Sequence, residues 1–447
     1  MSDELLGIAD RVVAMTKPGE QLEAVVVRGT DTEIRVYGGE VESLSSAQSQ
    51  GIGIRVIVDG RQGFAYAGSL DESVLAETLA EARDNAGFAS FDQFAGLATP
   101  DGVAVPVLDL YRDELESFAP ADKVAMAAEI ERVVLSADPR ISGIESAEYA
   151  DSLSQAAIAT STGIRTVGRE TSCYVATYAM ASEGDDTQTG FGFSVGRQPS
   201  DLDPARAANQ AAERATRMLG AVQPSSGRFT VVFDPWVTAQ FLGILGQTFD
   251  GDAVLKGRSL FAERLGESVA STIVTLVDDP TDVRSVTATD ADGEGLAARR
   301  NVLIENGVVK QFIHNAYTAR RAGTVSTGNA VRGFKSTPSV GCMSVSLVPG
   351  VTDPAALIAG ISDGVLVQEV SGLHSGVNPV SGDFSTGAEG LRIRNGQLAE
   401  PLREFTIAST LQKMLLDVQA IGNDLEFLPM NASGVSLVVS DLTISGS

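Results

Sequence analysis

The sequence predicts an α+β protein with helix–antiparallel meander–helix units in its N-terminal part and a curved, mainly antiparallel β domain with a few helices in its C-terminal part. Two stretches that run helix, alternating strands, helix predict the first part. Glycine-punctuated strands beyond residue 227 predict the second. The 447 residues exceed the roughly 250–300 that one core usually holds, so we expect more than one domain.

The first unit covers about residues 1–91. Its opening helix carries apolar side chains at helical spacing: Leu5, Ile8, Val12 and Met15. Residues 23–68 alternate polar and apolar and contain Asp59-Gly60, a type I′ hairpin signal, so they predict an antiparallel meander. Ser69-Leu-Asp71 then predicts the N-cap of a second helix, whose apolar face comprises Val74, Leu75, Leu79, Ala82 and Ala86.

A second unit, about 120–222, repeats this order after a connection over 92–119. We expect a helix over 121–136, strands over 144–195, and a further helix capped by Asp203-Pro204. Gly63-Phe-Ala-Tyr-Ala-Gly68 of the first unit resembles Gly190-Phe-Gly-Phe-Ser-Val-Gly196 of the second, since each precedes a capped helix. The two units of this 1–222 domain are either a duplicated module or two half-sheets.

The C-terminal domain is predicted over 223–447, with its boundary at Gln223-Pro-Ser-Ser-Gly227. Asn306-Gly307 and Asn395-Gly396 predict two hairpins. Apolar residues at helical spacing predict a late helix over 406–421, and Gly422-Asn423 provides its stop signal.

Charge and cysteine content limit the classes of function. A net charge of −25 disfavours nucleic-acid binding, which needs a basic surface to neutralise phosphates. The sequence has no apolar run near ~18 residues and no basic, apolar signal at its start, so we expect neither membrane insertion nor export. The two cysteines stand in no close motif, which favours reduced thiols in the cytoplasm.

Motifs for self-contained chemistry are incomplete. The only histidines, His314 and His374, are sixty positions apart (374 − 314) and form no local zinc motif. No nucleophile elbow and no P-loop lysine pattern occurs. The segment 290–295 has oxygen ligands at alternate positions, but the twelfth position of this calcium-loop pattern is Asn301, so a turn with solvated acids is favoured.

Two glycine-rich loops remain as candidates for binding a substrate or a partner chain. The segment 373–389 combines His374, Ser375, Asn378 and Asp383 with glycines that expose backbone donors and acceptors. Asn329 ends a similar loop, Ser326-Thr-Gly-Asn329. A plain turn is the alternative for each loop, and sequence adjacency gives no evidence of a His–Ser–Asp relay.

These segments resemble the TldD/PmbA family, once described as modulators of DNA gyrase. Each piece is short, but their order and spacing fit the family through the C-terminal half, and the N-terminal half fits more loosely. The pieces are Asp292-Gly-Glu-Gly295, Ala319-Arg-Arg-Ala-Gly323, Ser326-Thr-Gly-Asn329, Asn378-Pro-Val-Ser-Gly-Asp-Phe-Ser385 and Ile421-Gly-Asn-Asp424.

The zinc motif of this family is degenerate here. In the TldD branch a helix carries His-Glu-x-x-x-His and a cysteine near the C-terminus completes the site. The corresponding helix is Leu242-Gly-Ile-Leu-Gly-Gln247, so Leu242 and Gln247 replace the imidazoles and Gly243 replaces the general base. The segment 429–434 has no cysteine. The chain therefore resembles the PmbA branch, also called TldE.

The resemblance implies a non-catalytic, metal-free subunit. In the family a TldD subunit supplies the zinc, and the pair forms a cytoplasmic heterodimeric metalloprotease acting on unfolded or leader peptides. We therefore expect no cofactor in this chain, a TldD-like partner and extended peptide substrates. A stand-alone homodimer that binds peptides or a small ligand is the alternative, and an enzyme with Ser375 as its nucleophile is a third.

Overall fold

The structure is a computed structural model that describes residues 2–447. Its N-terminal part is built on one six-stranded antiparallel sheet of order β3-β2-β1-β4-β5-β6. The two predicted meanders supply three strands each and join through β1 and β4, so they are two halves of a single sheet. The strands are β1 (Glu20–Tyr37), β2 (Glu40–Val58), β3 (Arg61–Ala67), β4 (Ile141–Thr160), β5 (Arg165–Glu183) and β6 (Asp186–Gly196).

The hairpin turns form where their sequences predict them. Asp59 and Gly60 between β2 and β3 have φ of 47° and 70°, the left-handed values that a type I′ turn requires. The pairs at 306–307 and 395–396 have the same left-handed conformation. A further left-handed pair, Gly38 and Gly39, connects β1 to β2.

All the longer N-terminal helices pack on one face of the sheet. Those of the first half form one core cluster with β1–β4, and those of the second half form another with β1, β4 and β5. Met15, predicted on the first helix, lies past its end and is 43% exposed. The helices are α1 (Ser2–Val13), α2 (Glu72–Phe88), α3 (Asp113–Ser117), α4 (Pro120–Ala137) and α5 (Pro204–Arg217).

Glycines explain why the two halves resemble each other in sequence. A Cβ at Gly63 on β3 would lie 2.0 Å from the carbonyl oxygen of Ala82 in α2. A Cβ at Gly192 on β6 would lie 2.0 Å from the carbonyl oxygen of Ala207 in α5. Each outer strand therefore needs a residue without a side chain where a helix crosses it closely.

The C-terminal part contains a second six-stranded sheet of order β16-β15-β14-β7-β18-β17, in which β16 also pairs with β18 and only β14 and β7 are parallel. A four-stranded sheet, β10-β9-β8-β13, lies beside it. The strands are β7 (Gly227–Phe233), β8 (Leu276–Asp278), β9 (Asn301–Glu305), β10 (Val308–Val309), β11 (Ala330–Val331), β12 (Ser339–Val340), β13 (Val345–Leu347), β14 (Asp363–Ser371), β15 (Asp383–Arg394), β16 (Gln397–Thr410), β17 (Val418–Ile421) and β18 (Leu437–Ser445). The helices are α6 (Pro235–Gln247), α7 (Gly251–Leu255), α8 (Ala316–Ala322), α9 (Pro354–Ala359), α10 (Leu373–Gly376) and α11 (Leu411–Leu416).

The helix predicted over 406–421 is wrong. Residues 406–410 end β16, a single short helix follows, and 418–421 form β17. Thr406 pairs with Gly387 on one side and Ser445 on the other, so both edges of this backbone are used in ladders. Its β-branched residues suit that position, and tertiary pairing outweighs the helical spacing of the leucines that follow.

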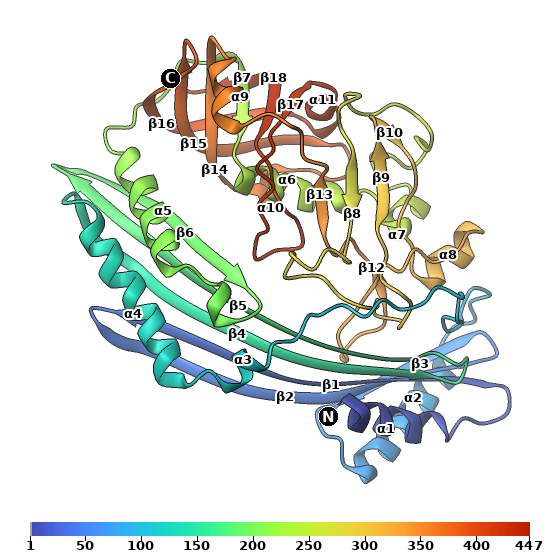
Figure 1. The fold of residues 1–447 in the computed structure, drawn as a ribbon. Coiled ribbons are helices and arrows are strands. Elements are labelled where there is room, and N and C mark those ends of the chain that lie inside the picture. Colours follow the sequence, from blue (N-terminus) through green and yellow to red (C-terminus); the bar gives the residue numbers. More distant parts are fainter. Residues whose placement is uncertain (1) are drawn as a thin grey trace.

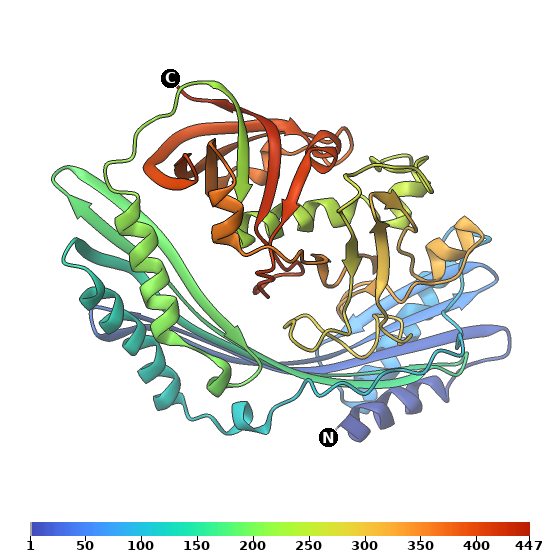
Figure 2. The same ribbon diagram turned by 45° about the horizontal axis from the view of Figure 1, so that its top comes forward.

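The sheet of the N-terminal part is long and curved, and the C-terminal part lies over its concave face, opposite the helices α1, α2 and α4 (Figures 1 and 2). At one end Phe191 and Phe193 of β6 lie 5.1 and 5.4 Å from Trp236 of α6, measured between ring centroids. At the other end Glu23 and Arg55 contact the C-terminal part through buried ion pairs. Within residues 2–447 no helix is long and apolar enough to cross a membrane.

Candidate functional site

Helix α6 places the positions at which the family resemblance locates zinc ligands. It follows β7 directly: the Asp234 side chain accepts a hydrogen bond from the Val237 N–H (2.9 Å), and Pro235 occupies the first turn. These are standard helix-start features. Burial raises the pKa of Asp234 to about 7, although Arg214 of α5 lies 3.1 Å away and acts in the opposite direction.

The three degenerate positions do not share one environment. Leu242 is only 2% exposed and belongs to the C-terminal hydrophobic core. Gly243 and Gln247 instead line a cavity of about 290 Å³. The face of α6 that holds Gly243 and Gln247 therefore opens onto a hollow, whereas the Leu242 side chain is used in packing.

The opposite wall of this cavity comes from distant segments. The Asn431 amide donates to the Cys342 carbonyl (3.5 Å), and a Cβ on Gly243 would lie 3.7 Å from Asn431 Oδ1. The segment 429–434, where the resemblance expects a cysteine, is thus brought to α6. Asp250 and Arg258 complete the polar lining.

The lining does not fit a zinc ion. Structural and catalytic zinc sites use three or four imidazole, thiolate or carboxylate ligands, and the groups here are two amides, one thiol and one carboxylate beside a guanidinium. Burial raises the pKa of the Cys342 thiol well above its usual range, so it is no ready thiolate. Across residues 2–447 no three His, Cys, Asp or Glu side chains are grouped closely enough to hold a metal ion.

Four candidate residues lie together on an exposed loop. His374, Ser375, Asn378 and Asp383 are all exposed. The last three line a shallow hollow of about 580 Å³. Pro379, next to Asn378, also lines the cavity beside α6, so this loop and that cavity are neighbours.

The loop does not form a His–Ser–Asp relay. Ser375 Oγ donates to the carbonyl of Gly372 (3.3 Å), which is within the same turn. The carboxylate of Asp383 accepts from Ser381 Oγ (2.7 Å). Both groups are engaged locally, so the geometry offers a polar binding surface and no activated nucleophile.

Asn329 has a different role from the loop residues. It is fully buried and uses all four of its side-chain hydrogen-bonding positions. Its amide donates to Asp278 Oδ2 (2.6 Å) and the Gly341 carbonyl, and its oxygen accepts from Asn301 Nδ2 and Thr327 Oγ1. Asn329 therefore holds loops in place and faces neither a substrate nor a partner.

Asp292 and Glu294 of segment 290–295 are buried and Asp290 is half-buried, so the expectation of a turn with solvated acids is wrong. Asp292 is 3% exposed and accepts hydrogen bonds from three backbone N–H groups. Glu294 is fully buried, pairs with Arg55 (3.2 Å) and accepts from the Ala316 N–H. Glu294 therefore joins the N- and C-terminal parts, whereas the three donors to Asp292 all lie within the C-terminal part.

His314 is also a structural residue. It is 6% exposed, and its Nδ1 lies 3.2 Å from Thr318 Oγ1. Burial lowers its pKa, which favours the neutral ring. A Cβ at Gly251 would lie 2.2 Å from this ring, so the imidazole is closely covered.

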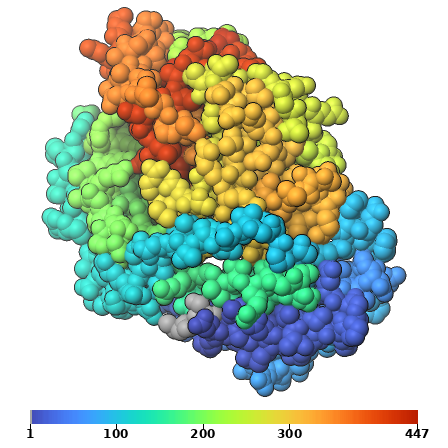
Figure 3. Space-filling view, turned by 45° about the vertical axis from the view of Figure 1, so that its right-hand side comes forward, coloured from blue at the N-terminus to red at the C-terminus, as the bar shows by residue number. Residues whose placement is uncertain are grey.

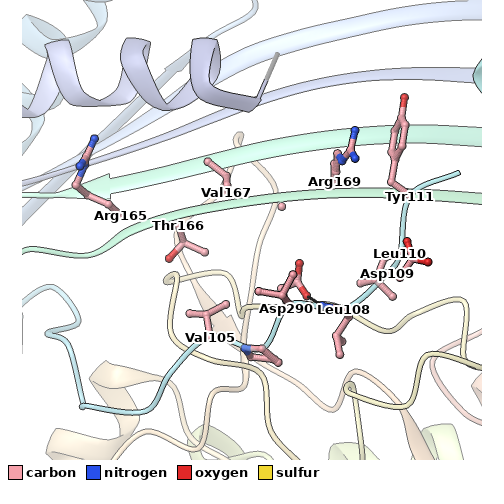
Figure 4. Close-up of a pocket in the computed structure, with 13 residues that line it drawn as sticks. Val105, Leu108, Asp109, Leu110, Tyr111, Arg165, Thr166, Val167, Arg169 and Asp290 are labelled. Carbon is pink, nitrogen blue, oxygen red and sulfur yellow. Dashed lines mark hydrogen bonds between the residues drawn. The ribbon is translucent and has the colours of Figure 1, made fainter. Parts of the chain in front are cut away.

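Sequence reasoning missed a hollow formed by the connection between the two halves. Residues 105–111 lie beside β5 and enclose about 550 Å³ with Arg165, Arg169 and Asp290 (Figure 4). The space-filling view shows this connection as a band between the sheet and the C-terminal part (Figure 3). Arg165 pairs with Asp10, and Arg169 stacks over the Tyr111 ring at 4.5 Å, so both cations are already engaged.

Comparison with known proteins covers nearly the whole chain. The PmbA/TldA metallopeptidase models match as domain 1 over 22–86, central domain over 113–219 and C-terminal domain over 226–446. Metalloprotease PmbA of Escherichia coli O157:H7 is 26% identical over 95% of this chain and 92% of its own length. A metalloprotease of Methanothermobacter thermautotrophicus is 30% identical over 88% and 86%.

The fold agrees with these matches. The crystal structure of TldE from Thermococcus kodakarensis superposes with a TM-score of 0.90 at 25% identity, covering 99% of both chains. The resemblance noted in the sequence is thereby confirmed at the level of the family. The chain belongs to the PmbA/TldD metallopeptidase family.

Proposed function

We propose that this chain is the non-catalytic, TldE-like subunit of a cytoplasmic heterodimeric metalloprotease whose zinc site lies in a TldD-like partner. The complex degrades or trims unfolded and leader peptides. The cavity beside α6 supports this proposal: it lies at the positions to which the family resemblance assigns zinc ligands, and Gly243, Gln247 and Asn431 line it. None of these can activate a metal-bound water.

The relatives support the activity of the family, and the residues of this chain support its role within the complex. The Escherichia coli and Methanothermobacter relatives are named metalloproteases. Here glycine occupies the position of the general base, and a glycine has no group that accepts a proton. Hydrolysis then requires groups from another chain.

The positive role of this subunit lies in binding. The exposed loop with His374, Ser375, Asn378 and Asp383 offers polar groups next to the cavity beside α6. Those groups suit contacts with an extended peptide backbone or with the partner subunit. In the complex, this subunit orients the substrate and the partner cleaves it.

The test is to measure hydrolysis of an unfolded peptide by this chain alone, by a TldD-like chain alone, and by their mixture. The proposal predicts no hydrolysis by this chain alone and the highest rate for the mixture. Gly243→Ala is the matched variant, because its added methyl meets only an ordinary contact and supplies no catalytic group; the mixture should keep its rate. Zinc-dependent hydrolysis by the isolated chain contradicts the proposal.

The same experiment separates the alternative of a stand-alone binding homodimer. Sedimentation of the mixture shows whether the TldD-like chain joins a stable complex. A homodimer that binds peptide and leaves the TldD-like chain unbound supports the alternative and overturns the subunit role.

A further inference from the structure

The first half of β2 in the long N-terminal sheet is paired on one side only. β1 pairs with β2 over its whole length, from Glu40 to Val58. β3 pairs with β2 only from Ile52 to Val58. Residues 41–50 therefore form an open edge, and all ten of them are exposed.

From residue 43 to residue 50 this edge lacks the usual protection, and Glu42 just before it is the one charged residue of the open edge. Native edge strands discourage pairing with lysines, prolines, charged side chains or bulges. Residues 43–50, Ser-Leu-Ser-Ser-Ala-Gln-Ser-Gln, contain no charge and no proline in a chain of net charge −25. The one irregularity in the β1–β2 ladder, at Arg35 and Val36, lies at the start of the open edge. The edge is thus a regular template for another strand.

The second half of the sheet shows what covers an equivalent edge. β6 pairs with β5 only from Cys173 onward, which leaves residues 165–172 of β5 as the counterpart of the β2 edge. The chain's own connection lies along that counterpart (Figure 4), and the Thr171 N–H donates to the Leu110 carbonyl (3.0 Å). An extended polypeptide segment covers one of two equivalent edges, and within residues 2–447 nothing pairs with the other.

Both faces of the sheet are hollowed next to the open edge. Leu44, Ser46 and Gln48 border a hollow of about 420 Å³ on the helix-bearing face. Ser45 and Ala47 border one of about 320 Å³ on the concave face. Since side chains of a strand point alternately to the two faces, an added strand would direct its own side chains alternately toward the two hollows.

The concave hollow favours basic side chains. Its wall includes Asp31 and Glu33, which lie directly across from Ala47 and Ser45 in the β1–β2 register. Both acids are exposed, and no ion pair among the described residues involves either of them. Both acids are on β1, which would lie two strand spacings, about 10 Å, from a strand added to β2. Only the small side chains of Ser45 and Ala47 on β2 would lie between. A lysine or arginine can cover that distance.

The hollow on the helix-bearing face favours apolar side chains. Its wall combines apolar side chains with polar ones, and its three charged members are already engaged: Arg28 with Glu4, Lys123 with Asp151, and Glu116 with the Tyr111 hydroxyl. Its apolar members come from strands and from the region of α3 and the start of α4: Ile34, Leu44, Leu115, Phe118, Pro120 and Leu153. This apolar part of the wall suits apolar side chains of an added strand.

We propose that the open edge of β2 between residues 41 and 50 binds an extended, flexible peptide by strand addition, with basic side chains alternating with apolar ones. A flexible peptide fits better than a strand of a folded partner, because a folded partner buries one face of its strand in its own core while both faces are needed here. The role of this site in holding substrate for the protease rests on the proposed function. Binding itself is measured without the partner, so its failure is distinguishable from failure of the subunit role.

The test uses the full chain and a fluorescein-labelled peptide of alternating lysine and valine, about ten residues long to match the edge. Two isomers are compared, one with N-methyl groups on every lysine and one with them on every valine. They share composition and charge, but each lacks the N–H donors along one edge only. Fluorescence anisotropy should show that one isomer binds like the unmethylated peptide and the other does not. Equal affinity of the two isomers overturns strand addition.

Variants of the protein test the same site from the other side. Asp31→Asn with Glu33→Gln should weaken binding of the lysine peptide by about three- to tenfold, as exposed ion pairs allow. A glutamate–valine peptide should not bind. Consecutive backbone N–H groups of a strand point to opposite edges, so one of Ser45→Pro and Ser46→Pro removes an N–H from the open edge and the other removes one from the ladder with β1. The first of these should keep the native circular dichroism and lose peptide binding. Undiminished peptide binding by that variant overturns the proposal. The proposal is also overturned if sedimentation shows a dimer and hydrogen exchange shows that a second copy of the chain covers residues 41–50.

Discussion

Glu23 is the residue whose change most directly tests how the two parts of the molecule are held together. Its carboxylate is fully buried and receives two hydrogen bonds from Arg55, at 2.7 and 3.0 Å, and one from Arg332 of the C-terminal part. Burial alone would raise the pKa of Glu23, but the two guanidiniums bring it below its usual value, so it is charged at neutral pH. Glu294 also pairs with Arg55 (3.2 Å), so the cluster holds two carboxylates and two guanidiniums.

Glu23→Gln keeps the size of the side chain and removes its charge. The cluster then holds two guanidiniums and one carboxylate, with one positive charge left buried and unpaired. Breaking a buried ion pair in this way costs about 3–5 kcal/mol, a large share of the roughly 5–15 kcal/mol that stabilises a typical fold. The structure predicts a loss of that size in the free energy of unfolding.

Urea unfolding followed by the fluorescence of Trp236, the only tryptophan, measures this loss. Trp236 packs against Phe191 and Phe193 of the N-terminal sheet, so its signal reports separation of the two parts. Arg165→Met is the matched control, because its ion pair with Asp10 is exposed to solvent and should contribute little to the free energy of unfolding.

A double-mutant cycle decides whether the charges act together. Glu23→Gln combined with Arg332→Met leaves one arginine and one carboxylate, so the pair of changes should cost about 1–3 kcal/mol less than the sum of the two single changes. A loss below about 1 kcal/mol for Glu23→Gln, or strict additivity in the cycle, would refute the assignment of this cluster as the connection between the two parts.

Three further outcomes follow from other buried groups. Asn329→Ala removes four buried hydrogen bonds and should lower the thermal stability by about 2–4 kcal/mol, measured by calorimetry. Burial raises the pKa of Asp234 and of Asp292 to about 7, above the unfolded value of about 3.9. The folded state therefore binds more protons than the unfolded state, and the free energy of unfolding should fall as pH rises from about 4 through 7. A urea midpoint at pH 8 that is no lower than the midpoint at pH 5.5 would contradict this. Gly192→Ala should cost about 1–3 kcal/mol in urea unfolding through its clash with α5, whereas Gly68→Ala, with open space around it, should be neutral.

The local signals in the sequence predicted most N-terminal elements because they depend on near neighbours. Asp59-Gly60 requires only that two consecutive residues adopt left-handed φ, and they do. The similarity of the segments at 63–68 and 190–196 was visible in the sequence, but its cause is the close crossing of a helix over each strand. Only the fold shows that crossing.

Long-range pairing explains what the sequence could not predict. The segment 406–410 has neighbours in both β15 and β18, which no local spacing reveals. Asn329 and His374 carry similar loop signatures, yet one is fully buried and the other exposed. The Glu23 cluster joins residues about 300 positions apart (332 − 23), so its members stand out only when the two parts are placed together.

The positions that the family resemblance identifies as degenerate zinc ligands stay a prediction. Gly243, Gln247 and Asn431 of the 429–434 segment line one cavity. Leu242 differs, because the same helix that carries the site also packs against the C-terminal core and that face needs an apolar side chain.

The most direct test of the subunit role is the zinc content of the complex with a TldD-like chain, measured by native mass spectrometry. The proposal predicts one zinc ion per heterodimer, retained when Gln247→Ala is made in this chain and lost when the partner's histidine motif is substituted. A zinc ion bound stoichiometrically by this chain alone would contradict it.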